Sequence, residues 1–179
     1  MSQLDQLMTE HPDLFTGLYR VGEPRRHTPA ITYQVETLAA TRDEALPLLE
    51  RHYEEIAQFK DVQKLDPDWD AYATMERAGR LWVMTVRDHG ALVGYIVMVI
   101  ARALHYKQLL VAQEDIHFLL PEYRKGLTGY RLLVKAKQSM HARGCKMIIM
   151  RCKAEIVNHA PLFERLGGEL SDLVYVFRT

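Results

Sequence analysis

The sequence contains few cysteines, no block of charge of one sign and no long apolar run. Two cysteines are present, and 23 basic residues balance 23 acidic residues. The balance excludes the surplus of positive charge that binds nucleic acid or acidic membranes without specificity. No stretch reaches the roughly 18 uncharged apolar residues that a membrane-spanning helix needs. With 48% hydrophobic residues, the composition predicts an ordinary soluble globular protein.

The cysteines and histidines do not form a pattern that indicates redox or metal chemistry. Cys145 and Cys152 lie in one apolar segment that, as a strand, would hold them too far apart for a disulfide. We expect two reduced thiols in a core strand rather than a nucleophile. The eight histidines lack the spacing of a zinc site, so no metal is predicted. The N-terminus lacks the basic and apolar blocks of a signal peptide, and we expect a cytoplasmic protein.

The domain organisation is expected to be simple. Residues 1–30 are polar and contain several prolines, which predicts an N-terminal extension with a short helix and an irregular arm. Residues 31–179 are long enough for one domain and contain neither an internal repeat nor a linker. We therefore predict a single domain over this range.

Hydrophobic periodicity predicts the secondary structure. Residues 31–38 alternate as in a strand, and Thr41 with Glu44 has the spacing of a capping box at a helix start. A second helix is expected from Asp66 to Gly79. The remaining segments are predicted as strands at 80–88, 91–102 and 108–120, a helix at 128–143, a buried strand at 145–152, a short helix capped by Asn158, and a closing strand at 173–179. The fold class is therefore α/β of the α+β type, with a mixed, mostly antiparallel central sheet flanked by helices.

The segment PEYRKGLTGYRLL, residues 121–133, carries the clearest chemical signal. Gly126 and Gly129 let the backbone turn tightly before a helix whose first N–H groups are unpaired at its positive dipole end. With Arg124 and Lys125, these N–H groups suit a pyrophosphate. The segment is neither a Walker loop nor the dinucleotide motif Gly-x-Gly-x-x-Gly. A glycine turn that only reverses the chain is the plain alternative.

Two segments resemble motifs of the GNAT superfamily of N-acetyltransferases. The stretch DIHFLLPEYRKGLTGYRLL, residues 115–133, is similar to its acetyl-CoA signature, whose loop reads Arg/Gln-x-x-Gly-x-Gly/Ala. The stretch NHAPLFERLGG, residues 158–168, loosely resembles its Asn-x-x-Ala-x-x-(Tyr/Phe)-x-x-x-Gly pattern. The resemblance covers about residues 31–179 and implies the acyl-CoA N-acyltransferase fold with acetyl-CoA as co-substrate. The cofactor contacts it implies are Phe118, Leu119, Arg124, Lys125, Gly126, Leu127, Thr128, Gly129, Tyr130, Asn158 and Phe163.

The sequence departs from the family pattern at two positions. Leu127 occupies the place of the central loop glycine, while Gly126 stands one place earlier, a form of loop that resembles some phage-encoded members. Phe163 stands where many relatives carry the tyrosine that protonates the leaving thiolate. The resemblance therefore leaves Tyr130, Tyr123 or a water as the general acid.

The resemblance also suggests where a catalytic base would lie. In the family fold the thioester lies where two parallel strands splay apart, here residues 113–118 and 146–151, and the usual base is a carboxylate on the first strand. Glu114 and Asp115 stand there, and Glu114 is slightly favoured. Because side chains alternate along a strand, His117 is expected to share the face of Asp115, either as a structural histidine or as a base.

The implied function is transfer of the acetyl group of acetyl-CoA to a primary amine, on a small molecule or on a protein lysine or N-terminus. The alternative is a GNAT-fold binding or structural module without transferase activity. The expected partners are acetyl-CoA and the amine acceptor, with a homodimer also considered, and neither nucleic acid nor membrane is expected. The location would be the cytoplasm, or the host cytoplasm for a phage-encoded protein. Trp69, Tyr72 and Trp82 either form an acceptor pocket or simply pack the core.

Overall fold

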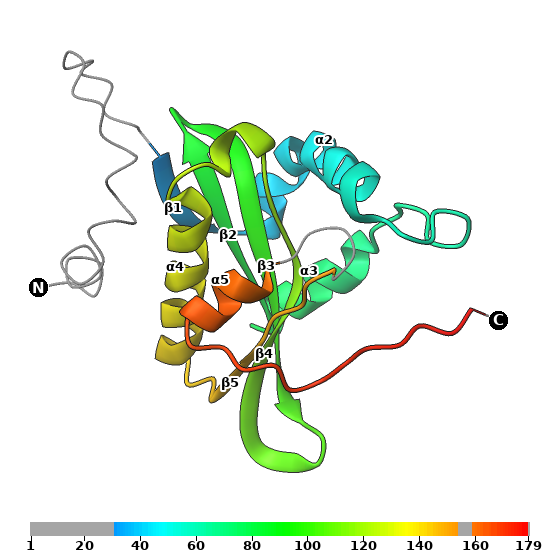
Figure 1. Ribbon diagram of the computed structural model, residues 1–179, viewed down its shortest axis with the longest axis vertical. Helices are drawn as coiled ribbons and strands as arrows, with labels where there is room; N and C mark the ends of the chain where they lie inside the picture. The colour runs from blue at the N-terminus through cyan, green and yellow to red at the C-terminus, as the bar shows by residue number, and fades with distance from the viewer. Residues whose placement is uncertain (1–30, 154–158, 179) are drawn as a thin grey trace, which may run out of the picture.

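A computed structural model describes residues 31–153 and 159–178 of the protein (Figure 1). Its strands and helices are β1 (Ile31–Glu36), α2 (Leu38–Ile56), α3 (Trp69–Arg77), β2 (Leu81–Asp88), β3 (Ala91–Ala103), β4 (Tyr106–Leu119), α4 (Thr128–Ala142), β5 (Met147–Ile149) and α5 (Ala160–Arg165), with a 3₁₀ turn at Pro121–Tyr123. The strands form one five-stranded sheet in the order β1-β2-β3-β4-β5. All neighbours are antiparallel except β5, which runs parallel to β4. The predicted fold class is confirmed.

The core lies where the central strands meet the helices. Strands β2 and β3 are buried along most of their length, as expected for central strands. Helix α4 packs on the sheet through Leu132, Leu133, Ala136 and Met140, which are the apolar positions that its periodicity predicts. Helices α2 and α3 lie on the other side of the sheet from α4 (Figure 1). The sheet is therefore covered on both faces.

The turn between β2 and β3 has the geometry that its sequence predicts. His89 and Gly90 both have positive φ angles, 48° and 88°, as in the two-residue turns whose twist matches a hairpin. The predicted hairpin is confirmed.

Helix α2 begins earlier than the capping-box spacing predicts. Its N-cap is Thr37, whose side chain accepts a hydrogen bond from the backbone of Ala40. Thr41 lies inside the first turn and donates its hydroxyl hydrogen back to the carbonyl of Thr37 at 3.1 Å. The prediction that Thr41 caps the helix with Glu44 is wrong, because Glu44 is engaged elsewhere.

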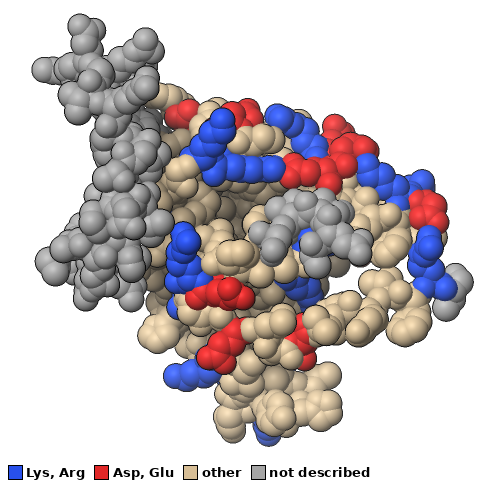
Figure 2. All heavy atoms as spheres, in the orientation of Figure 1, with Lys and Arg blue, Asp and Glu red and all other residues tan. Residues whose placement is uncertain are grey.

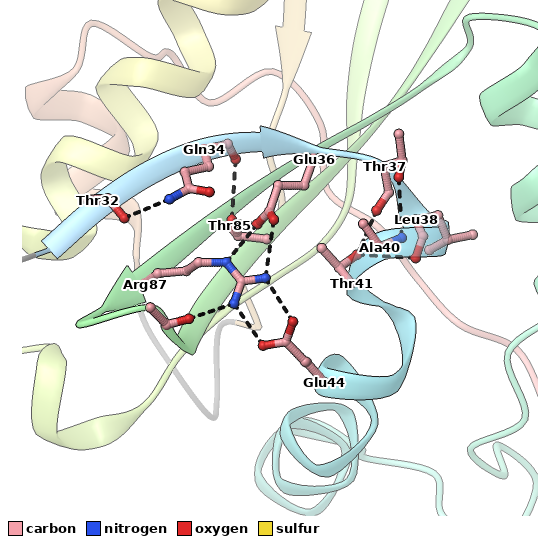
Figure 3. Close-up of polar contacts among 11 residues, drawn as sticks. Thr32, Gln34, Glu36, Thr37, Leu38, Ala40, Thr41, Glu44, Thr85 and Arg87 are labelled. Atoms are coloured by element: carbon pink, nitrogen blue, oxygen red, sulfur yellow. Dashed lines mark hydrogen bonds and ion pairs between the residues drawn. The ribbon is translucent and has the colours of Figure 1, made fainter.

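A buried arginine fastens α2 to the sheet (Figure 3). Arg87 on β2 donates to Glu36 on β1 at 2.9 Å and to Glu44 on α2 at 2.7 Å. It also donates to the carbonyl of Gly90 at 2.8 Å. Because its guanidinium has several donors in a fixed plane, one side chain joins a helix to two strands and the hairpin turn.

Helix α3, in contrast, begins later than predicted. Asp68, rather than Asp66, caps it by accepting a hydrogen bond from the backbone of Ala71 at 2.9 Å. Gly79 follows its end with a φ of 66°, as a left-handed helix cap requires. The predicted end is correct.

The C-terminal part of the chain contradicts two predictions. Strand β5 is only three residues long, and Met147 and Ile149 are exposed, so it is not a buried strand. Cys145 is buried while Cys152 is exposed, although both are free thiols as expected. Residues 173–178 form no strand and extend away from the sheet (Figure 1). Strand propensity becomes a strand only where a neighbouring edge is paired, and this segment pairs with none.

The described residues also bear on membranes and metals. In residues 31–153 and 159–178, no helix combines the length and apolar character needed to cross a membrane. Within the same ranges, no group of three or more histidine, cysteine or acidic side chains is placed to hold a metal ion. Acidic and basic side chains intermix over the face seen in Figure 2, so no field of one sign covers it.

Candidate active site

The candidate site is built around an irregularity in β4. Val97 on β3 pairs with Ile116, but the next residue, Met98, pairs with Glu114. Asp115 is therefore an extra residue on β4, which defines a β-bulge. A bulge interrupts the alternation of side chains and re-aims those that flank it, and bulges are frequent beside active sites.

Strands β4 and β5 separate at the same place. Their parallel pairing covers Val111–Gln113 against Met147–Ile149 and goes no further. The backbone N–H of Arg151 then donates to a carboxylate oxygen of Glu114 at 2.9 Å instead of to a β4 carbonyl. A gap thus begins beside the bulge, where the resemblance places one.

Glu114 and His117 form a pair on this side of the sheet. Nδ1 of His117 lies 2.5 Å from Oε1 of Glu114, and Glu114 is only 6% exposed. The expectation that His117 shares a face with Asp115 is wrong, because the extra residue in β4 changes the alternation. The bulge thereby assembles a carboxylate and an imidazole that simple strand geometry would separate.

The surroundings of Glu114 favour its charged form. Burial alone would raise the pKa of this carboxyl, but the hydrogen bonds from His117 and from the Arg151 backbone outweigh burial and lower it. Glu114 is therefore a carboxylate at neutral pH. A carboxylate that accepts from Nδ1 fixes the imidazole tautomer and leaves Nε2 as an acceptor. Within the described residues, Nε2 of His117 has no hydrogen-bond partner.

Asp115 is directed toward α3 rather than toward β5. It accepts a short hydrogen bond from the hydroxyl of Tyr72 on α3. Burial, followed by the hydrogen bond to Asp115, raises the pKa of Tyr72, so its hydroxyl keeps its proton. The two neighbouring acids are thus separated, with Glu114 beside β5 and Asp115 beside α3.

An apolar cavity of about 350 Å³ lies between α2, α3 and the sheet. We call it the α2–α3 pocket. His52 of α2 lies against it, with Nδ1 at 3.1 Å from the hydroxyl of Tyr95 and its ring 4.9 Å from that of Phe118. Burial lowers the pKa of His52 to about 4, so this histidine is neutral at physiological pH. The pocket therefore contains an uncharged polar group within largely apolar walls.

The glycine loop that follows β4 is open and rich in free donors. Gly126 has a φ of 83°, and a side chain at Gly129 would meet only Leu119, at 3.7 Å. Leu127 is the N-cap of α4 and provides no side-chain hydrogen bond. Within the described residues, no acceptor is found for the backbone N–H groups of residues 125–130. Such a row of N–H groups at the start of a helix is suited to an anion.

The two cations of the loop have different surroundings. Arg124 donates from Nε to the carbonyl of Leu119 at 2.7 Å and forms a two-pronged ion pair with Glu55 of α2 at 2.6 and 2.7 Å. It therefore fixes the loop to α2. Lys125 is exposed and, among the described residues, has no ion-pair partner. Its charge is the one that the loop can present to a ligand.

The other predicted site residues fall around this centre. The ring centre of His117 lies 6.5 Å from that of Phe163 on α5 and 5.0 Å from that of His159. Tyr123 donates to Asp88 at 2.9 Å, so its hydroxyl is already engaged. Asn158, predicted as a helix cap and cofactor contact, lies outside the described residues.

Sequence reasoning did not identify His52, Tyr95, Arg151 or His159 as parts of this site. These residues come from separate parts of the chain, and no motif with a fixed sequence spacing connects them. Of the three aromatic residues considered for an acceptor pocket, Trp69 and Tyr72 line the α2–α3 pocket, whereas Trp82 is buried in the core.

Comparison with known proteins bears on the fold. No family model matches the sequence, and no curated protein matches it. Among solved structures, a ribosomal-protein-alanine N-acetyltransferase from Brucella melitensis biovar Abortus 2308 aligns with a TM-score of 0.64 at 16% identity, covering 84% of this chain and 99% of that one. An aminoglycoside acetyltransferase from an uncultured soil metagenomic sample aligns with a TM-score of 0.65 at 14% identity, covering 84% of this chain and 99% of that one. The chain has the GNAT acetyltransferase fold.

A third GNAT-fold structure, an acetyltransferase from Clostridium acetobutylicum with acetyl-CoA, aligns with a TM-score of 0.62 at 8% identity, covering 83% of this chain and 96% of that one. At such identities the likeness establishes the fold alone. Function therefore has to be argued from the site.

Proposed function

We propose that this protein is an N-acetyltransferase that moves the acetyl group of acetyl-CoA directly to a primary amine. The observation that carries the proposal is the Glu114–His117 pair, located where β4 and β5 separate. Direct transfer needs a base that takes a proton from the amine, and an imidazole with a free Nε2 beside a carboxylate meets that need. The proposed acceptor is a small molecule or a protein lysine or N-terminus.

In this proposal the three candidate side chains have different tasks. His117 takes the amine proton at Nε2. Glu114, whose oxygens already accept from His117 and from the Arg151 backbone, holds the ring and stabilises its charged form. Asp115, which accepts a hydrogen bond from Tyr72 of α3, would contact the amine of the acceptor. The slight preference for Glu114 as the base is therefore replaced by a preference for His117.

The residues of the glycine loop fit acetyl-CoA. The free N–H groups of residues 125–130, the positive end of α4 and the charge of Lys125 would hold the pyrophosphate. Phe118, Leu119 and Phe163 would line the path of the rest of the molecule. Bound there, acetyl-CoA supplies an activated acetyl thioester.

A binding module without transferase activity is the second candidate. It is favoured by Leu127 in place of the family glycine and by Phe163 in place of the family tyrosine. This candidate predicts that CoA can bind while no amine is acetylated.

Isothermal titration with acetyl-CoA, compared among three proteins, tests the cofactor site. The proteins are the unchanged chain, Gly129→Glu and Gly129→Gln. Position 129 has space for a side chain, and an acid in the first turn of a helix suits the helix dipole, so both variants should fold. We expect micromolar binding by the unchanged chain, with a loss of at least about tenfold in Gly129→Glu beyond the loss in Gly129→Gln, because phosphate and carboxylate repel. Absence of binding by the unchanged chain would refute the proposal.

Turnover separates the two candidates. Release of free CoA thiol in the presence of amines should be lost in His117→Gln, while acetyl-CoA binding is retained. No thiol release by the unchanged chain with any amine, despite binding, would support the module without activity.

A homodimer is proposed on separate grounds. The apolar segment 173–178 is exposed, with Leu173 at 72% and Phe177 at 89%, and β5 also exposes Met147 and Ile149. Exposed apolar residues with strand propensity can pair with the sheet edge of a second copy. Light scattering should show a dimer that Val174→Lys weakens, and a monomer at all concentrations would contradict it.

A further inference from the structure

The α2–α3 pocket has the size of a site for a small molecule. Its volume of about 350 Å³ falls near the lower end of ligand cavities, which span about 300–1,000 Å³. The residues that line it come from α2, α3 and the segment between them on one side and mainly from strands β2, β3 and β4 on the other. One small ring system fits this space better than a peptide or an oligosaccharide.

The walls of the pocket are mainly apolar. Ala45 and Leu49 from α2 face Val83, Val97 and Ile116 from the sheet. The lining also includes four aromatic side chains, which are Tyr53, Trp69, Tyr72 and Tyr95. A flat apolar ligand would be buried against these groups on several sides.

The charged residues of the pocket are exposed and favour one sign. Arg42, Lys64 and Lys153 are basic, whereas Asp66 is the only acid among the lining residues that the structure describes. The guanidinium of Arg42 lies 4.9 Å above the ring of Trp69, which holds it at the pocket. A ligand with several positive charges would be repelled here.

The pocket reaches the candidate active site at the bulge. Ile116 of β4 and Tyr72 of α3 both line it, and Tyr72 donates to Asp115. A single ammonium group could therefore lie beside the Asp115 carboxylate while the body of the molecule occupies the pocket. The proposed base, His117, follows Ile116 directly along β4, and His52 of the pocket lining interacts electrostatically with both His117 and Glu114.

We infer that the acceptor is a monoamine with an aromatic or similarly flat apolar body, bound in the α2–α3 pocket with its amine toward Asp115. Polyamines and aminosugars are the classes that the apolar walls and basic rim disfavour. This inference rests on the proposed function and specifies its acceptor.

Titration calorimetry without acetyl-CoA tests the inference on the full chain. The probes are tryptamine, spermidine and glucosamine. We expect tryptamine to bind at least about tenfold more tightly than either of the others. Ala45→Phe fills the pocket from α2 and should weaken tryptamine binding at least about tenfold. Ala39→Phe makes the same change at an exposed position of the same helix outside the pocket lining and should leave tryptamine binding unchanged.

A rim variant keeps the test decisive if Ala45→Phe does not fold. Arg42→Glu reverses an exposed charge and should tighten spermidine binding by at least about threefold at low salt. No change in spermidine binding would overturn the role of the rim. Equal or tighter binding of spermidine or glucosamine to the unchanged chain would overturn the acceptor class, and tryptamine binding that survives a folded Ala45→Phe would overturn the location.

Acetyl-CoA titration distinguishes failure of this inference from failure of the proposed function. Acetyl-CoA binding without tryptamine binding would overturn the inference and leave the proposed function standing. Tryptamine binding without acetyl-CoA binding would refute the proposed function while supporting the pocket as an apolar amine site.

Discussion

Replacing Glu114 by glutamine tests whether the bulge in β4 assembles a catalytic pair. The change keeps the size of the side chain but removes the charge that His117 and the Arg151 backbone both contact. A hydrogen bond to a charged group contributes about 1.5–3 kcal/mol against about 1 kcal/mol for a neutral one, so Glu114→Gln should lower the free energy of unfolding by about 1–2 kcal/mol. The protein should therefore remain folded.

The effect on turnover should be much larger than the effect on stability. Without the carboxylate, His117 loses the group that fixes its tautomer and stabilises its charged form, and kcat should fall by about 10²–10⁴-fold. Because acetyl-CoA contacts are proposed elsewhere, its binding should be unchanged. Thiol release and calorimetry measure the two quantities on one preparation.

The neighbouring acid provides the matched control. Asp115→Asn changes the next residue in the same way, but this side chain is directed toward α3 and accepts from Tyr72, which an amide oxygen can still do. We expect a higher KM for the amine with a smaller change in kcat. If Glu114→Gln retained kcat within about threefold, or Asp115→Asn lost as much as Glu114→Gln, the assigned roles would be refuted.

Three further predictions concern stability, each measured by urea unfolding. Burial lowers the pKa of His52 from 6.5 to about 4, so the folded state disfavours its protonation. The free energy of unfolding should therefore fall by about 3 kcal/mol as the pH drops from 6.5 toward 4. His52→Phe should remove this pH dependence, whereas His89→Phe, at an exposed position, should not. Arg87→Leu should cost about 1.5–3 kcal/mol because it removes charge-assisted hydrogen bonds to Glu36 and Glu44, and a loss below about 1 kcal/mol would contradict the fastening of α2. Met140→Ala should lower the free energy of unfolding by about 2–5 kcal/mol because this side chain is fully buried. Met147→Ala, at an exposed position, should be nearly neutral. Equal losses for the two variants would refute the assignment of Met140 to the core.

Features that depend on consecutive residues were predictable from the sequence. The turn at His89–Gly90, the apolar face of α4 and the open glycine loop before it all follow from local backbone preference and periodicity. The fold class and the region of the candidate site followed as well. The start of α2 does not follow from composition, because Thr37 and Thr41 are equally good caps and the choice depends on where β1 ends and what Glu44 contacts.

The arrangement of the site was decided by the tertiary structure. An extra residue opposite Met98 places Glu114 beside His117 and Asp115 beside Tyr72, and no local pattern in β4 announces it. The strand predicted near the C-terminus fails for a related reason, since residues 173–178 have strand propensity but no paired edge. Backbone preference is a property of neighbours along the chain, whereas strand register and the facing of side chains are set by the partner strand across the sheet.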